Sequence, residues 1–183
     1  MDQSDEQELI REFKRGNEQA FNQLVLRYQE KVYWIVRRMI SDHDEANDLA
    51  QNIFIKAYHS LHSFKGNSTF YTWLYRIAVN LTLNEIRRKK IRHIFSLERE
   101  EPLQIASNDD QPLELLEKTE QQMIIRQAID RLPEKQKKVF VLRYYEELPY
   151  EEISKILNTS VGGLKANYFH AVRNIGKFLK HEK

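Results

Sequence analysis

The chain has 183 residues, 41% hydrophobic and 31% charged, which is enough for one medium domain or two small ones. It contains no cysteine, so disulfides and thiolate metal sites are excluded and a reducing compartment is favoured. The N-terminus is acidic without an apolar signal core, and no window holds the roughly 20 apolar residues that a membrane helix needs. We therefore expect a cytoplasmic protein that does not insert into a membrane.

The net charge of +2 hides a segregated charge pattern. Residues 65–92 hold seven basic residues and one acid, and residues 96–120 hold eight acids against two basic residues. From residue 153 to the end there are six basic residues and one acid. Two basic segments separated by an acidic one predict two contacts with a polyanion and a connector that avoids it.

Helical periodicity runs through almost the whole chain, and glycine and proline are scarce at five and four. The fold class we expect is all-α, with two small helical domains joined by an acidic linker. The domains are expected at 1–95 and 113–183, with the linker at 96–112. Helices are expected over 5–15, 18–40, 45–62, about 69–90, 113–132, 134–146, 150–157 and 161–180.

The outer face of the helix at 45–62 combines carboxylates and amides with one isoleucine, Ile55. An isoleucine in such surroundings is a hint of a protein-binding face. A lone exposed apolar residue is also common on ordinary surfaces, so both interpretations stay open here.

The stretch 64–90 begins as a short polar loop and continues as a helix with two unlike faces. One face is apolar and suits a core. The other is cationic and amide-bearing, and it begins with an indole at Trp73. Such a face can bind phosphates and base edges, while a loop beside aromatic rings can hold an unstacked base. The alternative is an ordinary basic surface helix with Trp73 half-buried.

The last two expected helices, 150–157 and 161–180, are joined by a tight connection at 158–160. A short helix, a tight turn and a longer helix with a basic outer face are typical of a helix-turn-helix, whose second helix enters the major groove. An ordinary αα-hairpin is the alternative. Val172 is expected in the buried stripe of the second helix, and Met123 and Tyr144 are expected to face inward earlier in this domain.

Signals for catalysis are absent from the sequence. There is no phosphate-cradling glycine loop, and the six histidines are scattered without an acid partner at metal-binding spacing. We expect no enzyme activity, no cofactor and no metal site.

Three motifs together resemble the extracytoplasmic-function sigma factors, the smallest class of bacterial RNA polymerase specificity subunits. DEANDLAQNIF at 44–54 resembles the segment that grips the clamp helices of the polymerase β′ subunit. FKGNSTFYTWLYRIAVN at 64–80 resembles the promoter-melting and −10-reading segment. LPEKQ at 132–136, YEEI at 150–153 and VGGLK at 161–165 resemble domain four, which reads the −35 element.

The resemblance implies a role for each matching position. Core polymerase, through its β′ clamp helices and β subunit, promoter DNA and an anti-sigma factor are the implied partners. The residues implied to bind core polymerase are Asp44, Asp48, Leu49, Gln51, Asn52 and Ile55. Those implied for −10 DNA are Lys65, Gly66, Asn67, Ser68, Thr69, Trp73, Arg76, Asn80, Asn84, Arg87 and Arg88. Those implied for −35 DNA are Ser160, Gly163, Lys165, Ala166, Asn167, His170, Arg173 and Lys177.

The chain departs from the family pattern at several positions. Pro149 stands where a Ser or Thr usually caps the scaffold helix, so a side-chain acceptor is missing there. Asn167 replaces a frequent Arg on the reading face, and because Asn suits adenine where Arg suits guanine, the family's usual −35 sequence is not assumed.

The leading prediction is a sigma factor that binds core polymerase, recognises the −10 and −35 elements and initiates transcription. The alternative is a stand-alone helix-turn-helix regulator of duplex DNA, which leaves 64–90 without a purpose. A pure protein-interaction module leaves the segregated charge unexplained.

Overall fold

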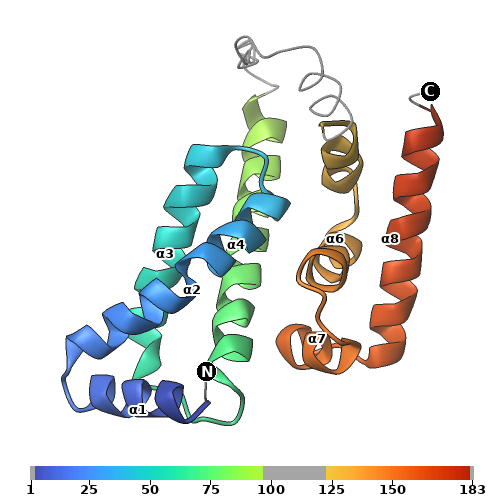
Figure 1. Ribbon diagram of the computed structural model, residues 1–183. Helices are drawn as coiled ribbons and strands as arrows, with labels where there is room; N and C mark the ends of the chain where they lie inside the picture. The colour runs from blue at the N-terminus through green and yellow to red at the C-terminus, as the bar shows by residue number, and fades with distance from the viewer. Residues whose placement is uncertain (1–2, 97–122, 182–183) are drawn as a thin grey trace, which may run out of the picture.

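The computed structural model describes residues 3–96 and 123–181, which form helices joined by short turns (Figure 1). Residues 97–112 of the expected linker and 113–122 of the helix expected after it lie outside the described residues. Within the described residues, no helix is long and apolar enough to cross a membrane.

The N-terminal bundle consists of α1 (Gln3–Lys14), α2 (Glu18–Met39), α3 (His43–Leu61) and α4 (Phe70–Ser96). A polar side chain starts each of the last three helices by accepting a hydrogen bond from a free backbone N–H. Asn17 accepts from the N–H of Gln19 at 3.1 Å, Asp42 from Glu45 at 2.8 Å and Thr69 from Thr72 at 3.1 Å. The expected bounds of the first three helices agree with the structure to within two residues, whereas α4 continues six residues beyond its expected end at residue 90.

The core of this bundle is built from the faces that the periodicity predicts. Leu24, Val32 and Ile35 of α2 are fully buried, as are Ile53 of α3 and Leu74 of α4. Burying an aliphatic side chain of this size stabilises the fold by about 1.5–3 kcal/mol, so these contacts fix how the helices cross.

The C-terminal helices comprise a helical segment at 123–130, α6 (Glu134–Phe140), η1 (Val141–Tyr145), α7 (Tyr150–Leu157) and α8 (Val161–His181). The prediction of one regular α-helix over 134–146 is wrong, because the chain widens into a turn of π-helix at η1. A π-turn holds more residues than an α-turn, so the side chains beyond it change phase. Tyr144 is consequently 57% exposed rather than buried, and it stacks on Phe140 with ring centroids 5.1 Å apart.

The predicted helix-turn-helix is present in α7 and α8. The chain turns at Asn158, whose φ of 49° is left-handed, a conformation that asparagine tolerates. Pro149 precedes α7 without a side-chain cap, as its sequence position predicts. Two expectations of burial are wrong, since Val172 is 47% exposed and Met123 is 52% exposed. Val172 faces a groove toward α2, as described below.

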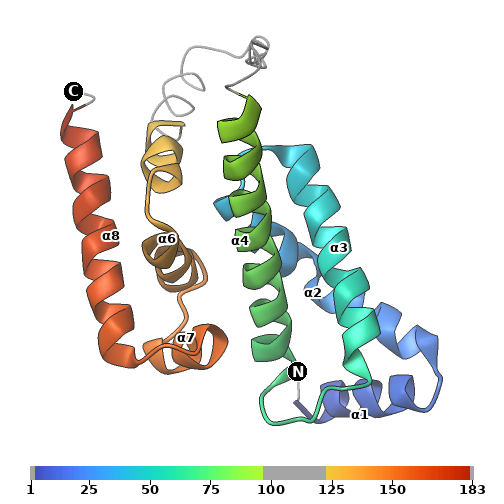
Figure 2. The ribbon, with the colours of Figure 1, turned by 180° about the vertical axis from the view of Figure 1, so that it is seen from behind.

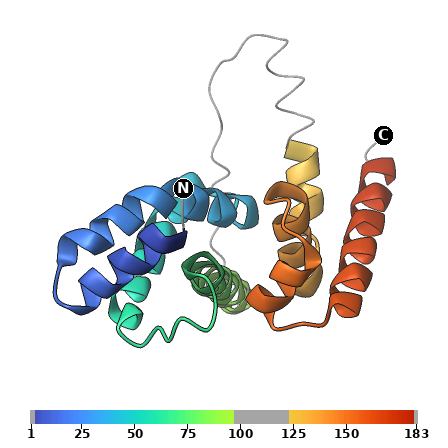
Figure 3. The same cartoon turned by 60° about the horizontal axis from the view of Figure 1, so that its bottom comes forward.

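The two groups of helices pack against each other, with α4 in the middle (Figures 1 and 2). Viewed from below, nearly along α4, this helix has α2 and α3 on one side and α7 on the other (Figure 3). The sequence predicts a single buried stripe on α4. The structure buries a second side of the helix as well, where Tyr75 is fully buried and Thr72 is 4% exposed. The buried core is continuous from the N-terminal bundle into the C-terminal helices.

Candidate nucleic-acid and polymerase interfaces

The loop before α4 is held in a defined shape by its two ends. Gly66 has φ of 74°, a left-handed conformation in which a side chain is strained. At the other end the Thr69 hydroxyl caps α4 and lies 2.9 Å from the Thr72 hydroxyl. Lys65, Gly66 and Asn67 are exposed in this loop. The loop therefore presents backbone and small polar groups at the start of a long helix.

Trp73 packs beneath this loop rather than projecting from the helix. Its ring lies 5.2 Å from that of Phe64 and 5.6 Å from that of Phe70, and its side chain is half-buried. Tilted aromatic neighbours at these distances support one another and leave one edge accessible. The sequence places Trp73 on the polar face, and the structure places it at the border between that face and the core.

The polar face of α4 continues as a stripe of exposed side chains at helical spacing. Arg76, Asn80, Asn84 and Arg87 follow one another at steps of three or four residues, and all are exposed. Arg87 receives support from within the stripe, because its guanidinium donates to the Asn84 side-chain oxygen at 3.2 Å. We call these four residues the α4 stripe.

Arg88, which is also predicted to bind −10 DNA, contacts Glu85 and not the residues of the α4 stripe. Its guanidinium donates to Glu85 at 2.9 Å, and Arg92 donates to the same carboxylate oxygen at 3.1 Å. Both arginines are well exposed, so these are surface pairs that a phosphate can replace at little cost.

The α4 stripe is partly covered by the C-terminal helices. Arg87 makes a two-pronged ion pair with Glu134 at the start of α6, with the Nε–Oε2 distance at 2.9 Å. The hydrogen bond to Glu134 and its charge raise the pKa of Arg87 above its ordinary value. Arg76 donates to the backbone carbonyl of Lys155 in α7.

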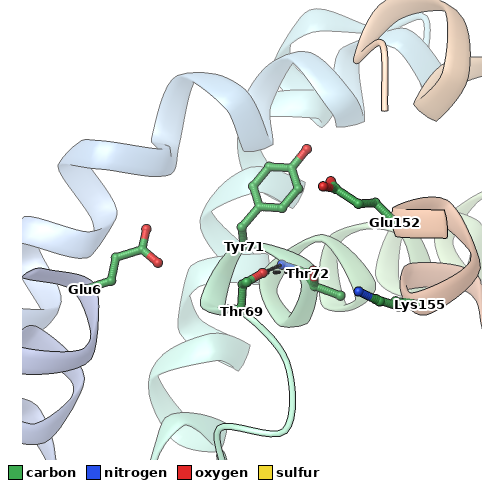
Figure 4. A pocket seen from close by; sticks show the side chains of 6 residues that line it. All are labelled: Glu6, Thr69, Tyr71, Thr72, Glu152 and Lys155. Carbon is green, nitrogen blue, oxygen red and sulfur yellow. Dashed lines mark hydrogen bonds between the residues drawn. The ribbon is translucent and has the colours of Figure 1, made fainter. Parts of the chain in front are cut away.

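A small pocket of about 220 Å³ lies beside the capped start of α4 (Figure 4). Its walls come from α1, from the start of α4 and from α7. Tyr71 and Glu152 approach each other across it, and Lys155 closes it beside Thr72 (Figure 4). Burial raises the pKa of Tyr71 well above the ordinary value, and the negative charges of Glu146 and Glu152 add to this, so its hydroxyl stays neutral.

The predicted polymerase-binding residues form one exposed face of α3. Asp44, Asp48, Gln51 and Ile55 are exposed at steps of three or four residues, with Asn52 exposed beside them. Ile55 is 56% exposed, so an apolar side chain stands at the end of an acidic and amide-bearing strip. Leu49, also predicted here, is 8% exposed and supports the face from beneath.

The residues predicted to bind −35 DNA differ in their contacts: some have exposed side chains, and others hydrogen-bond to the backbone of α8. Ser160 caps α8 by accepting from the N–H of Gly163 at 3.3 Å. Asn167 donates to the carbonyl of Gly163 at 2.8 Å, so its amide is turned back onto its own helix. The predicted residues of α8 that are exposed are Lys165, Ala166, His170, Arg173 and Lys177.

Phe169 lies among these exposed residues, although it was not predicted to belong to this surface. Its side chain is 63% exposed, an unusual position for a phenylalanine on a basic surface. The signal was available, because Phe169 is four residues after Lys165 and four before Arg173 on one helical face.

A larger groove of about 750 Å³ separates α2 from the C-terminal helices. Aromatic and aliphatic side chains dominate its walls, together with three arginines. No local sequence signal marks this groove, because its walls come from segments that are distant in the chain. The lining residues are Trp34, Arg37, Arg38, Ile125, Arg126, Ile129, Phe140, Tyr144, Tyr145, Tyr168, Val172, Ile175 and Leu179.

Metal-binding clusters are not found within 3–96 and 123–181, where three or more His, Asp or Glu side chains nowhere converge suitably. The chemistry that these surfaces offer is recognition of phosphates, bases and protein.

Two family models match the chain at the segments that carry these surfaces. The model described as Sigma-70 region 2 matches residues 24–91, and the model described as Sigma-70, region 4 matches residues 122–175. The first match includes α3, the loop and most of α4, and the second includes α7 and most of α8.

Two solved protein complexes contain a chain with the same fold. CnrH in complex with the cytosolic domain of CnrY matches with a TM-score of 0.71 at 20% identity, over 98% of this chain and 99% of that one. The sigma factor RpoE in complex with the anti-sigma factor NepR from Bartonella quintana matches with a TM-score of 0.65 at 22% identity, over 89% and 98%. At these identities the likeness shows the shared fold.

Relatives with higher identity span almost the whole chain. The chain is 35% identical to the RNA polymerase sigma-H factor of Pseudomonas aeruginosa over 97% of its length and 95% of the relative's. It is 38% identical to the ECF RNA polymerase sigma factor SigW of Bacillus subtilis over 93% and 95%, and 38% identical to the ECF RNA polymerase sigma-E factor of Escherichia coli over 93% and 92%. This chain therefore belongs to the ECF RNA polymerase sigma factors, a family of transcription factors rather than enzymes.

Proposed function

We propose that this sigma factor opens and reads the −10 element with the loop 65–69 and the α4 stripe. The observation that carries the proposal is the arrangement of both parts on one surface. The loop 65–69, which contains Gly66 in a left-handed conformation, lies beside the rings of Phe64, Phe70 and Trp73. The exposed arginines and asparagines of the α4 stripe follow this loop along the helix. Extruding one base costs a few kcal/mol of stacking, which a shaped loop and charge-assisted phosphate contacts can offset.

The −35 element is proposed to meet the exposed face of α8. Lys165, Arg173 and Lys177 would contact phosphates, while His170 and the exposed Phe169 would face base edges in the major groove. An apolar ring is suited to the methyl group of thymine. The Asn167 side-chain amide donates to the Gly163 carbonyl, so Asn167 would position its neighbours on α8 without contacting a base.

Core polymerase is proposed to bind the exposed face of α3. Asp44, Asp48 and Gln51 offer acceptors to a basic partner, and Ile55 offers an apolar anchor near the end of the strip. Both kinds of contact on one helix are typical of a protein interface. Promoter DNA and core polymerase are both in the bacterial cytoplasm, so we propose that the protein acts there.

An anti-sigma factor is proposed as a further partner, and the groove between α2 and α8 is its candidate site. The groove combines apolar walls with Arg37, Arg38 and Arg126, so it suits an amphipathic helix with acidic flanks. Such a helix would contact both α2 and the C-terminal helices and so fix their relative position.

The test of the proposed function uses the full chain reconstituted with core polymerase. A duplex promoter is first selected from a random library with the wild-type holoenzyme. Replacing Arg76 and Arg87 together with Ala should abolish transcription from this duplex while core binding stays within about twofold, because each arginine supplies a charge-assisted phosphate contact.

The matched control is Arg15→Ala, which removes an exposed arginine that directly follows α1 and is outside the α4 stripe. It should transcribe like the wild type. Failure of the wild-type protein to bind core polymerase would overturn the proposed function, and normal transcription by the double variant would remove the α4 stripe from it.

A further inference from the structure

The loop proposed to hold a base has few bonds of its own. Within the described residues, the backbone of residues 65–68 makes no hydrogen bond to another backbone group. A segment without such bonds opens easily unless the groups at its two ends hold it in place. The shape of this loop therefore depends on what anchors Phe64 before it and Thr69 after it.

The first anchor comes from α1. The ammonium of Lys14, the last residue of this helix, donates a hydrogen bond to the Phe64 carbonyl. The Lys14 nitrogen also lies 6.0 Å from the centroid of the Phe64 ring. The Phe64 N–H donates to the Leu61 carbonyl at 3.1 Å, but no backbone N–H of the described residues donates to the Phe64 carbonyl. Lys14 is therefore the donor that fixes the peptide at which the loop begins.

Phe64 connects this anchor to the aromatic cluster beside the loop. Its ring lies 5.2 Å from that of Trp73, in the first turn of α4, and Trp73 lies 5.6 Å from Phe70. The carbonyl that Lys14 holds and the ring that supports Trp73 belong to the same residue. A shift of the Phe64 peptide therefore moves the support of Trp73.

The end of α1 that carries Lys14 is itself firmly packed. Phe13 is 2% exposed, and its ring lies 5.5 Å from Phe21, 5.2 Å from Tyr58 and 4.8 Å from His62. These neighbours belong to α2 and to the end of α3, from which the chain enters the loop. Helix α1 lies at the same end of the bundle as the loop (Figures 1 and 2). It is thus a fixed support for the Lys14 contact.

Helix α1 also reaches the exit of the loop. Glu6, with its side chain 12% exposed, accepts a hydrogen bond from the Tyr28 hydroxyl. Tyr28 is 6% exposed, and its ring lies 5.5 Å from that of Phe70, the first residue of α4. Glu6 and Thr69 line the same small pocket (Figure 4). One helix thus contacts the residues that support both ends of the loop.

We propose that α1 sets the shape of the −10 loop and that Lys14 is a positioning residue for recognition of the base. The inference rests on the proposed function of the loop. Lys14 acts through the Phe64 carbonyl and does not contact the DNA. Because Lys14 is exposed, loss of its ammonium leaves the core of the bundle intact and loosens the loop. The consequence is weaker discrimination between bases, with unchanged binding of core polymerase.

The first measurement follows the surroundings of Trp73 in the free chain. The chain has two tryptophans, so Trp34→Phe leaves Trp73 as the single reporter. In this background Lys14→Met removes the donor and keeps an unbranched side chain. The acrylamide quenching constant of Trp73 should rise roughly twofold as the packing beside the loop loosens. Lys14→Arg should restore the original value, because a guanidinium can donate to the same carbonyl.

The second measurement follows base selectivity in the holoenzyme. Non-template oligonucleotides from the selected promoter carry each of the four bases in turn at every −10 position, and their affinities are compared by anisotropy. The position read by the loop is the one at which Asn67→Ala changes the base preference. There Lys14→Met should lower the affinity ratio between the best and worst base roughly fivefold, while affinity for core polymerase changes less than twofold. Lys14→Arg should keep the selectivity of the wild type.

Arg11→Met is the matched control. Arg11 lies on the same helix as Lys14 and forms an ion pair with Glu8 of that helix at 2.7 Å. Its replacement removes the same charge and leaves the bond to the Phe64 carbonyl in place. This variant should keep the quenching and the selectivity of the wild type. Equal loss of selectivity in Arg11→Met and Lys14→Met would indicate an effect of charge alone and overturn the role of the Phe64 contact.

Failure of this inference is separable from failure of the proposed function. If the wild-type holoenzyme has no base preference that depends on Asn67, the loop does not read a base, and the inference falls with the proposed function. If that preference exists and Lys14→Met leaves it unchanged, the loop reads the base without help from Lys14, and the inference alone is wrong. Loss of core-polymerase binding in Lys14→Met would also overturn it, because Lys14 would then serve the polymerase interface.

Discussion

Single side chains in this protein often serve the fold and a surface at the same time. Thr69 caps α4 with its hydroxyl and also ends the loop proposed to hold a base. Trp73 braces that loop on Phe64 and Phe70 instead of standing free in solvent. At this scale, ordinary packing and capping position the residues that we propose to read DNA.

Replacing Thr69 with Ala should lower the free energy of unfolding by about 1 kcal/mol, because the N–H of Thr72 loses its acceptor. Urea denaturation followed by circular dichroism measures the change. Thr69→Ser keeps the hydroxyl and should recover most of the loss. Equal destabilisation by both substitutions would show that the methyl group, not the cap, matters.

Helices and their faces are the scale at which the sequence is most informative. The bounds of α7 were predicted to the residue, since Pro149 and the turn at 158–160 are local signals. The π-turn at η1 carries no such signal, and it moved Tyr144 out of the core. Phe169 was missed because the helix was divided into buried and polar stripes, whereas an exposed aromatic fits neither.

Element-scale reasoning gives a prediction for α8. If Arg173 and Lys177 contact phosphates, replacing either with Ala should lower the salt slope of duplex binding by about one, because one fewer counterion is released. Anisotropy titrations over a range of salt concentrations measure the slope. Lys135→Ala, an exposed lysine on α6, should leave it unchanged. An unaltered slope in the α8 variants would place them off the DNA.

At the scale of the whole molecule, contacts between residues far apart in the chain could not be predicted from the sequence. Arg87 and Glu134, or Arg38 and Glu146, are far apart in the chain, and no local pattern pairs them. Composition predicted two basic segments separated by an acidic one, but not that Arg76 and Arg87 of one basic segment bond to the C-terminal helices. The buried second side of α4, with Tyr75 and Thr72, follows from that packing.

The most direct measurement of the central claim is a photocrosslink from position 67, in the exposed loop between Gly66 and Thr69. Asn67 is replaced by benzoylphenylalanine in the full chain, and the crosslinked strand is mapped on a selected promoter. The account predicts crosslinks to the non-template strand at the −10 element when core polymerase is present, and very few from the free protein. Crosslinks confined to the −35 duplex, or none to the non-template strand in the open complex, would contradict it.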